Sequence, residues 1–103
     1  MPTILSIMES SGLDRKEWPC EWSAFFRCWL LCDVTLTDDE AEALFAHALR
    51  KAIRARGRLR IEIDLDGFTE VRLSLSDGQA EHDAAPTELD ALAALLRAVK
   101  GAA

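Results

Sequence analysis

Apolar residues recur every three to four positions between residues 38 and 56, which is the spacing of an amphipathic helix with one buried face. The expected buried stripe consists of Ala41, Leu44, Phe45, Ala48, Leu49 and Ala52, with Ile53 at its edge. Thr37 and Glu40 have the T-x-x-E spacing of a capping box at the helix start. Acidic residues begin the segment and basic residues end it, which complements the helix dipole. Gly57 stands where a left-handed C-cap would end the helix.

Two later segments, residues 58–65 and 70–75, alternate apolar and polar side chains with a period of two. That period predicts two strands, each with one buried and one solvated face. A last helix is expected over about residues 87–100, after Pro86 and before Gly101. Its apolar stripe is Leu89, Leu92, Leu96 and Val99.

The length of the loop between the two strands fixes their register. A two-residue loop at 66–67 would mix polar and apolar side chains on one face, so it is rejected. A three-residue loop, residues 66–68, matches the faces and places Glu62 opposite Arg72. A five-residue loop would instead oppose Arg60 with Arg72, two like charges. We therefore expect the three-residue loop or an equivalent bulge.

The segment between residues 18 and 36 fits two templates. Its aromatic residues fall at helical spacing, but every even position from Cys20 to Leu36 is apolar. The strict alternation favours a strand over roughly 24–36, preceded by an irregular or briefly helical stretch over 13–21. Residues 3–8 are expected to add a short edge strand, within an irregular lead-in over 1–16.

The expected element order is (β)βαββα in one domain covering residues 1–103. This order predicts an α+β fold with an antiparallel or mixed sheet and two helices packed on one face. The length of 103 residues fits one domain with a modest core.

Charge and cysteine usage narrow the function classes. Twelve basic and 18 acidic residues give a net charge of −6, which argues against general coating of nucleic acids or membranes. The N-terminal residues lack the pattern of a signal peptide, and no run of 18 apolar residues predicts a membrane span. The three cysteines, Cys20, Cys28 and Cys32, are an odd number with no trusted zinc spacing, so reduced, buried thiols in a cytoplasmic protein are expected. Abundant Ala, Leu and Arg with three lysines is typical of a bacterial coding sequence.

An aromatic cluster over residues 18–29 is one candidate interaction site. If this segment is a strand, its even positions fill the core, including Trp22 and Phe26. Phe25 and Trp29 then lie on the opposite face and are free for a partner or a second subunit. The alternative places all the aromatic side chains in the core.

A run of basic residues is the second candidate. Six positive charges lie within eleven residues and no acidic residue interrupts them. They could bind phosphates or an acidic surface; alternatively they complement the helix dipole and continue along a solvated strand. The partner-binding residues predicted from the two candidates together are Trp18, Phe25, Trp29, Arg50, Arg54, Arg56, Arg58 and Arg60.

The sequence predicts a non-enzymatic protein-binding module without a cofactor or bound metal. We expect a homodimer or a small adaptor, inhibitor or immunity-type protein, for example a phage- or plasmid-encoded inhibitor of a nucleic-acid enzyme. No phosphate-binding, dinucleotide-binding, serine-hydrolase or zinc-protease motif is present. One alternative is a nucleic-acid-binding regulator that uses Arg50–Arg60. Another is a metal-dependent enzyme that uses Glu62, Asp64 and Asp66, although a solvated strand face explains these carboxylates more simply.

Overall fold

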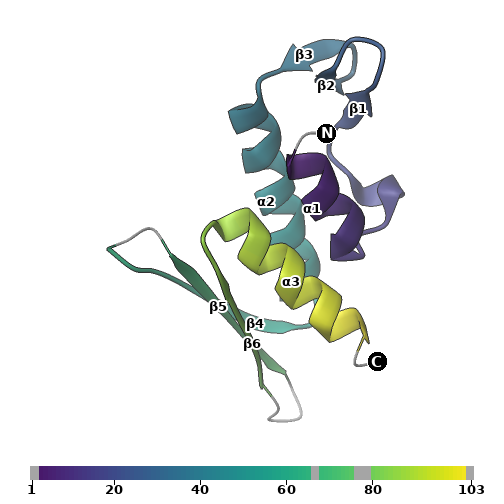
Figure 1. Cartoon of the computed structure of the whole chain (residues 1–103). Helices are drawn as coiled ribbons and strands as arrows, with labels where there is room; N and C mark the ends of the chain where they lie inside the picture. The colour runs from purple at the N-terminus through teal and green to yellow at the C-terminus, as the bar shows by residue number, and fades with distance from the viewer. Residues whose placement is uncertain (1–2, 66–67, 76–79, 102–103) are drawn as a thin grey trace.

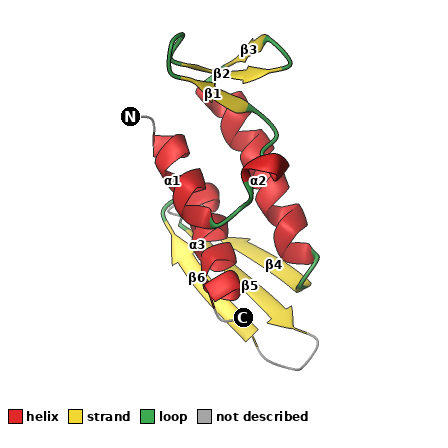
Figure 2. Cartoon of the chain, turned by 90° about the vertical axis from the view of Figure 1, so that its right-hand side faces the viewer, coloured by secondary structure: helices red, strands yellow, loops and turns green. Residues whose placement is uncertain are grey.

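The structure is a computed structural model that describes residues 3–65, 68–75 and 80–101. Within these ranges the chain forms three α-helices and two three-stranded antiparallel sheets (Figure 1). The order is α1 (Thr3–Ser11), a 3-10 turn η1 (Arg15–Glu17), β1 (Glu21–Ser23), β2 (Cys28–Leu31), β3 (Val34–Leu36), α2 (Asp38–Arg54), β4 (Gly57–Ile63), β5 (Thr69–Leu75), β6 (Ala80–Ala85) and α3 (Glu88–Gly101). The predicted α+β class, with helices packed on one face of an antiparallel sheet, is confirmed (Figure 2).

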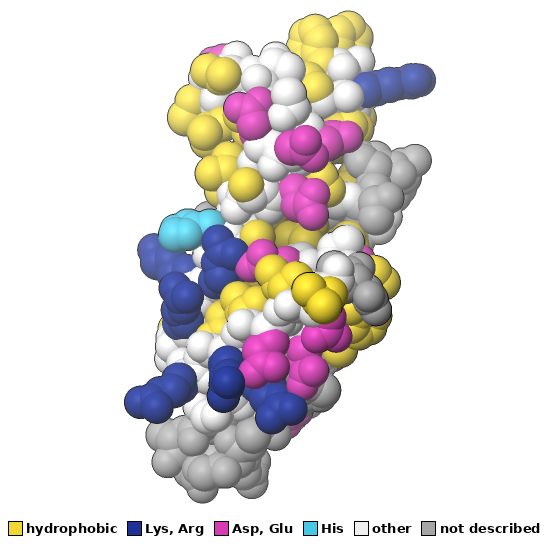
Figure 3. Space-filling model, turned by 90° about the vertical axis from the view of Figure 1, so that its left-hand side faces the viewer, with side chains coloured by type: hydrophobic (Ala, Val, Ile, Leu, Met, Phe, Trp, Pro, Cys, Tyr) yellow, Lys and Arg dark blue, Asp and Glu magenta, His cyan; other side chains and the backbone are white. Residues whose placement is uncertain are grey.

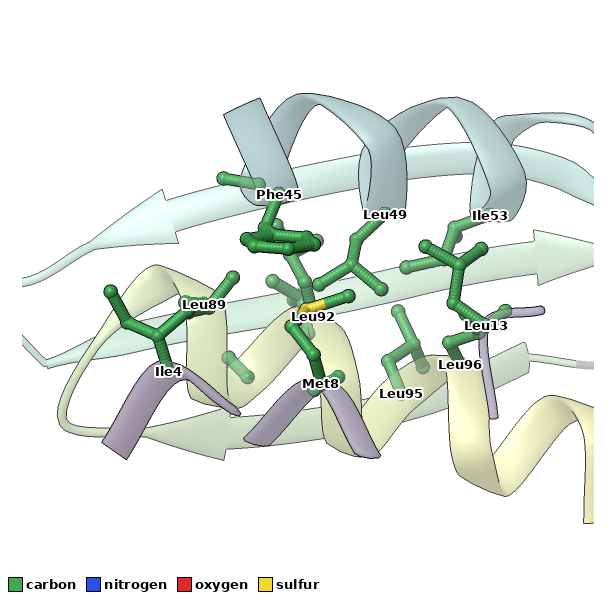
Figure 4. Packing of buried hydrophobic residues seen from close by; sticks show 14 of the residues in the cluster. Ile4, Met8, Leu13, Phe45, Leu49, Ile53, Leu89, Leu92, Leu95 and Leu96 are labelled. Carbon is green, nitrogen blue, oxygen red and sulfur yellow. The ribbon is translucent and has the colours of Figure 1, made fainter. Parts of the chain in front are cut away.

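The helices form the centre of the molecule. Figure 2 shows the β4–β5–β6 sheet beneath them, whereas the β1–β2–β3 meander lies at the other end, beside the start of α2. Figure 4 shows side chains of all three helices converging on one core. The labelled core residues are Ile4, Met8, Leu13, Phe45, Leu49, Ile53, Leu89, Leu92, Leu95 and Leu96. None of the helices in the described ranges combines the length and apolar character that crossing a bilayer requires.

The predicted start of α2 is confirmed. The Glu40 N–H donates to Thr37 Oγ1 at 3.2 Å, and the Thr37 N–H donates to Glu40 Oε1 at 3.0 Å. The second hydrogen bond favours the ionised carboxylate and lowers the pKa of Glu40. The α3 helix also begins as expected, since the Asp90 N–H donates to the Thr87 hydroxyl oxygen at 3.2 Å. All four residues of its predicted stripe are buried.

The predicted left-handed cap at Gly57 is wrong. The helix α2 ends at Arg54 with Ala55 in the right-handed conformation, and Gly57 begins β4. A Cβ atom at Gly57 would lie 2.3 Å from the carbonyl oxygen of Ser74 on β5. Glycine is therefore required here because two backbones approach closely, and not because the helix needs a left-handed residue.

The predicted three-residue loop between β4 and β5 is also wrong. The strands pair in the five-residue register, with Arg60 opposite Arg72 and Glu62 opposite Glu70. The like charges are accommodated because each arginine pairs with a glutamate two residues along its own strand. Arg60 Nε lies 2.9 Å from Glu62 Oε1, and Arg72 Nη2 lies 2.9 Å from Glu70 Oε1. These exposed ion pairs remove the repulsion that argued for the shorter loop.

The third strand of this sheet, β6, was not predicted. Its sequence, AEHDAA, has no alternating apolar pattern. Glu81 and Asp83 pair with Leu73 and Val71 across the sheet and are partly buried. The strand is held at the sheet edge by its backbone pairing and by the packing of α3.

In the N-terminal third, two expected strands are replaced by other elements. Residues 3–8 belong to a helix, α1, which buries Ile4, Leu5 and Met8 against α2 and α3. The expected strand over 24–36 is two strands, β2 and β3, joined by a turn at Cys32–Asp33 and preceded by a turn at 24–27. Both Cys32 (φ 47°) and Asp33 (φ 70°) are left-handed, as a two-residue hairpin turn requires. The brief helical turn expected within 13–21 corresponds to η1.

We predict that Thr37→Ala lowers the free energy of unfolding by about 1 kcal/mol, because Glu40 loses the acceptor for its backbone N–H. Thr37→Ser keeps the hydroxyl and should stay within a few tenths of a kcal/mol of the wild type. Urea unfolding followed by circular dichroism measures both. Equal stability of the alanine variant and the wild type would contradict the cap.

Candidate functional site

The aromatic cluster divides into a buried group and an exposed pair. Trp29 is fully buried, with its ring centroid 5.0 Å from that of Phe45 on α2 and 5.3 Å from that of Trp22. Trp18 completes the group: its ring lies 5.3 Å from Phe45, and its indole N–H donates to the Leu13 carbonyl oxygen at 3.1 Å. We call Trp18, Trp22, Trp29 and Phe45 the indole stack. It is the contact that attaches the meander to the helices.

The placement of Trp29 corrects the expectation that it lies on the outer face of the sheet. Trp22 pairs with Trp29, and Trp29 pairs with Leu36, so these three side chains share the inner face of the sheet. The inward residues are therefore even-numbered on β1, odd-numbered on β2 and even-numbered on β3. Each turn of even length reverses the parity of the inward side chains. Trp29 is therefore unavailable to a partner in this structure, and Trp18 is largely engaged by the fold.

The exposed pair lies on the turn between β1 and β2. Phe25 is 87% exposed and Phe26 is 67% exposed, and their rings contact edge to face with centroids 4.9 Å apart. The turn is held by the Phe26 N–H, which donates to Ser23 Oγ at 3.1 Å, and it ends at left-handed Arg27 (φ 54°). Phe25 faces solvent, as the strand interpretation predicted. Phe26, which was expected in the core, is exposed as well.

The outer face of the meander continues from this pair. Cys28 and Leu30 alternate with buried Trp29 on β2 and face away from the helices. A shallow hollow of about 530 Å³ is lined by Phe26, Cys28, Leu30, Asp33 and Thr35. Leu31 and Val34 pair with each other beside the β2–β3 turn, on the face of Trp29, and are 39% and 61% exposed. The exposed pair and the hollow form one apolar surface at this end of the molecule.

A second set of exposed apolar residues lies beside the β4–β5 loop of the other sheet. Ile63, Leu65 and Phe68 flank the β4–β5 loop and are at least 42% exposed. They adjoin residues 66–67, which lie outside the described ranges. Leu65 serves below as a control for apolar exposure away from the meander.

The structure divides the basic residues of 50–60 into two that form ion pairs within the described part of the chain and four that do not. The Arg50 guanidinium pairs with the Glu88 carboxylate on α3 and is partly buried, and Arg60 pairs with Glu62. Lys51, Arg54, Arg56 and Arg58 are exposed and form no ion pair with other described residues. Figure 3 shows most of the basic side chains on the lower half of one face, with acidic and apolar side chains among them.

The described part of the chain contains no group of three or more His, Cys, Asp or Glu side chains placed to hold a metal ion. Of the three carboxylates considered from the sequence, Glu62 pairs with Arg60, Asp64 is exposed, and Asp66 lies outside the described residues. All three cysteines are free, with Cys20 buried and Cys32 exposed.

Comparison of the chain with protein-family models, curated proteins and solved structures gives no match in any of the three cases. Sequence reasoning missed Phe26 and Leu30 as residues of the outer surface because it missed the two turns. Ser23 was the available signal for the first turn, since serine side chains accept hydrogen bonds from turn N–H groups. The Cys-Asp pair of the second turn carries a weaker signal than Asn-Gly.

We predict stability effects of very different size for two aromatic truncations. Trp29→Ala should lower the free energy of unfolding by about 3–5 kcal/mol because it opens a cavity in the indole stack. Phe25→Ala should change it by less than about 0.5 kcal/mol because the ring is already in water. Urea unfolding compares them, and Trp29→Phe provides a milder variant if the alanine variant does not fold. A larger loss for Phe25→Ala than for Trp29→Ala would contradict the assignment.

The cysteines should differ in reactivity. Burial raises the pKa of the Cys20 thiol to about 11, so at pH 8 it remains protonated and unreactive towards a disulfide reagent, whereas exposed Cys32 reacts. Because the unfolded thiol ionises near its ordinary pKa of 9.0, the free energy of unfolding should fall as the pH rises above 9. Labelling followed by peptide mapping, with Cys32→Ser as the control, measures the reactivity of the two thiols. Rapid labelling of Cys20 at pH 8 would contradict it.

Proposed function

We propose that the protein is a non-enzymatic protein-binding module that contacts its partner through the meander, with Phe25 and Phe26 as anchors. The observation that carries this proposal is the exposed, edge-to-face phenylalanine pair on a hydrogen-bonded turn. Burying a phenylalanine side chain contributes roughly 1.5–3 kcal/mol, and in the free chain both rings leave most of that contribution unused. A partner surface that covers them would gain it.

The turn that carries Phe25 and Phe26 is held by a hydrogen bond, and this favours a role in binding. A preorganised turn loses little conformational entropy when a partner covers it. Aromatic side chains near the centre of an interface carry a large share of binding energy. The indole stack behind the turn supports this arrangement, since it holds β2 against α2.

The negative charge beside the meander favours a protein over a nucleic acid as the partner. The residues that follow the meander, Asp38, Asp39 and Glu40, are exposed and acidic. They would repel phosphates that approach the phenylalanine pair. The alternative of nucleic-acid binding rests on Lys51, Arg54, Arg56 and Arg58, which lie at the other end of α2 and its continuation into β4.

Site-specific photo-crosslinking tests the proposal. A benzophenone amino acid in place of Phe25 should capture a discrete protein in cells that produce the chain, and the same probe in place of Leu65 should not. With that protein purified, Phe25→Ser combined with Phe26→Ser should weaken binding at least about tenfold, because two aromatic anchors are lost. Leu65→Ser should bind like the wild type.

Two results would overturn the proposal. Equal capture from positions 25 and 65 would show unspecific adhesion of exposed apolar groups. A probe in place of Lys51 could instead be the only one that captures a partner, with the captured product lost after nuclease treatment. That result would favour nucleic-acid binding by the basic residues at the end of α2.

A further inference from the structure

The hollow on the outer face of the meander identifies the chemistry of the partner, and this inference rests on the proposed function. Cys28 and Leu30 form its apolar floor, and Phe26 of the exposed pair borders it. Asp33 and Thr35 bring polar groups to the same hollow. Asp33 is exposed and makes no ion pair with the other described residues. The hollow thus offers apolar contact and a carboxylate side by side.

The surroundings of the hollow are acidic. Residues 18–42 contain six acidic residues and a single basic one, Arg27, which gives this part of the chain a net charge of −5. The acidic residues are Glu21, Asp33, Asp38, Asp39, Glu40 and Glu42. Figure 3 shows acidic and apolar side chains interspersed over this half of the molecule. An occupant of the hollow therefore meets the Asp33 carboxylate as well as apolar side chains.

The charge argues against a second copy of this chain in the hollow. A symmetric dimer through this face would bring Asp33 and Glu21 of the two copies towards one another, and like charges at an interface oppose association. A wholly apolar occupant would remove water from the Asp33 carboxylate without replacing its hydrogen bonds, which is costly. An occupant that carries a cation beside its apolar side chains avoids both penalties.

We propose that the hollow binds a cationic amphipathic segment of a partner protein. Apolar side chains of the segment pack on Leu30 and Cys28 and against Phe26. Lysine or arginine side chains of the segment pair with Asp33 and Glu21. The phenylalanine pair supplies most of the affinity, and the acidic rim selects among apolar partners by charge.

Three synthetic peptides of equal length serve as probes: an amphipathic Leu/Lys peptide, its Leu/Glu counterpart, and a Ser/Lys peptide of equal positive charge. Titration into ¹⁵N-labelled protein should show the Leu/Lys peptide shifting the amide signals of residues 26–35. The Leu/Glu and Ser/Lys peptides should bind at least about tenfold more weakly, since each lacks one of the two complementary features.

Two variants locate the effect. Asp33→Asn should weaken Leu/Lys binding about two- to fivefold, the effect of one exposed ion pair, because asparagine tolerates the left-handed backbone and removes only the charge. Thr35→Lys should weaken it further, because it places a cation in the hollow. Asp64→Asn changes an exposed acidic residue that directly follows β4; it is the matched control and should leave binding unchanged.

Similar affinities for all three peptides, or an equal effect of Asp33→Asn and Asp64→Asn, would overturn the inference. The wild type without peptide could also have twice the monomer mass in solution, and Thr35→Lys could restore the monomer mass. That result would assign the hollow to a second copy of the chain and would also overturn the inference. If position 25 captures a protein but the peptides show no charge preference, the proposed function stands and this inference fails. If position 25 captures nothing, the proposed function fails as well.

Discussion

The packing of the Trp29 indole against Phe45 and Trp22 is the contact on which the N-terminal half of the molecule depends. The meander has strands of only three or four residues, too few to form a core of their own. Its position therefore follows from the indole stack, which joins it to α2. Once Trp29 points inward, the geometry of the strand requires Cys28 and Leu30 to point outward. The buried contact and the exposed surface are two consequences of the same alternation.

The helix α2 links two ends of different chemistry. Its capped N-terminus carries Asp38, Asp39 and Glu40 and adjoins the meander, while its C-terminal turn carries Lys51 and Arg54 and leads into the basic strand β4. This order stabilises the helix through its dipole. It also separates the surface charge, so that the apolar surface lies in acidic surroundings. The proposed choice of a cationic partner thus follows from the same residues that stabilise the helix.

The elements that local rules determine could be predicted from the sequence. The capping box at Thr37, the stripe of α3 and the alternation of β5 all act within one helix or strand, and the structure confirms them. The alternation of β4 holds only as far as Ile61, since Ile63 and Leu65 are exposed. The failures arose where two segments had to be placed against each other. A turn at Cys32–Asp33 without glycine or asparagine concealed a reversal of the chain and exchanged the faces of Trp29 and Leu30. In the same way, ion pairs along single strands permitted a register in which Arg60 opposes Arg72.

Native-state hydrogen exchange tests the central physical claim, that the indole stack makes the meander a firm part of the fold and hence a preorganised surface. The β2 amides that pair with β1 and β3 should open with a free energy close to that of the α2 amides, because Trp29 couples the two elements. Exchange of the β2 amides at nearly the unprotected rate, while α2 stays protected, would contradict the claim. The meander would then be loosely attached, and its exposed phenylalanines would not form an ordered binding surface.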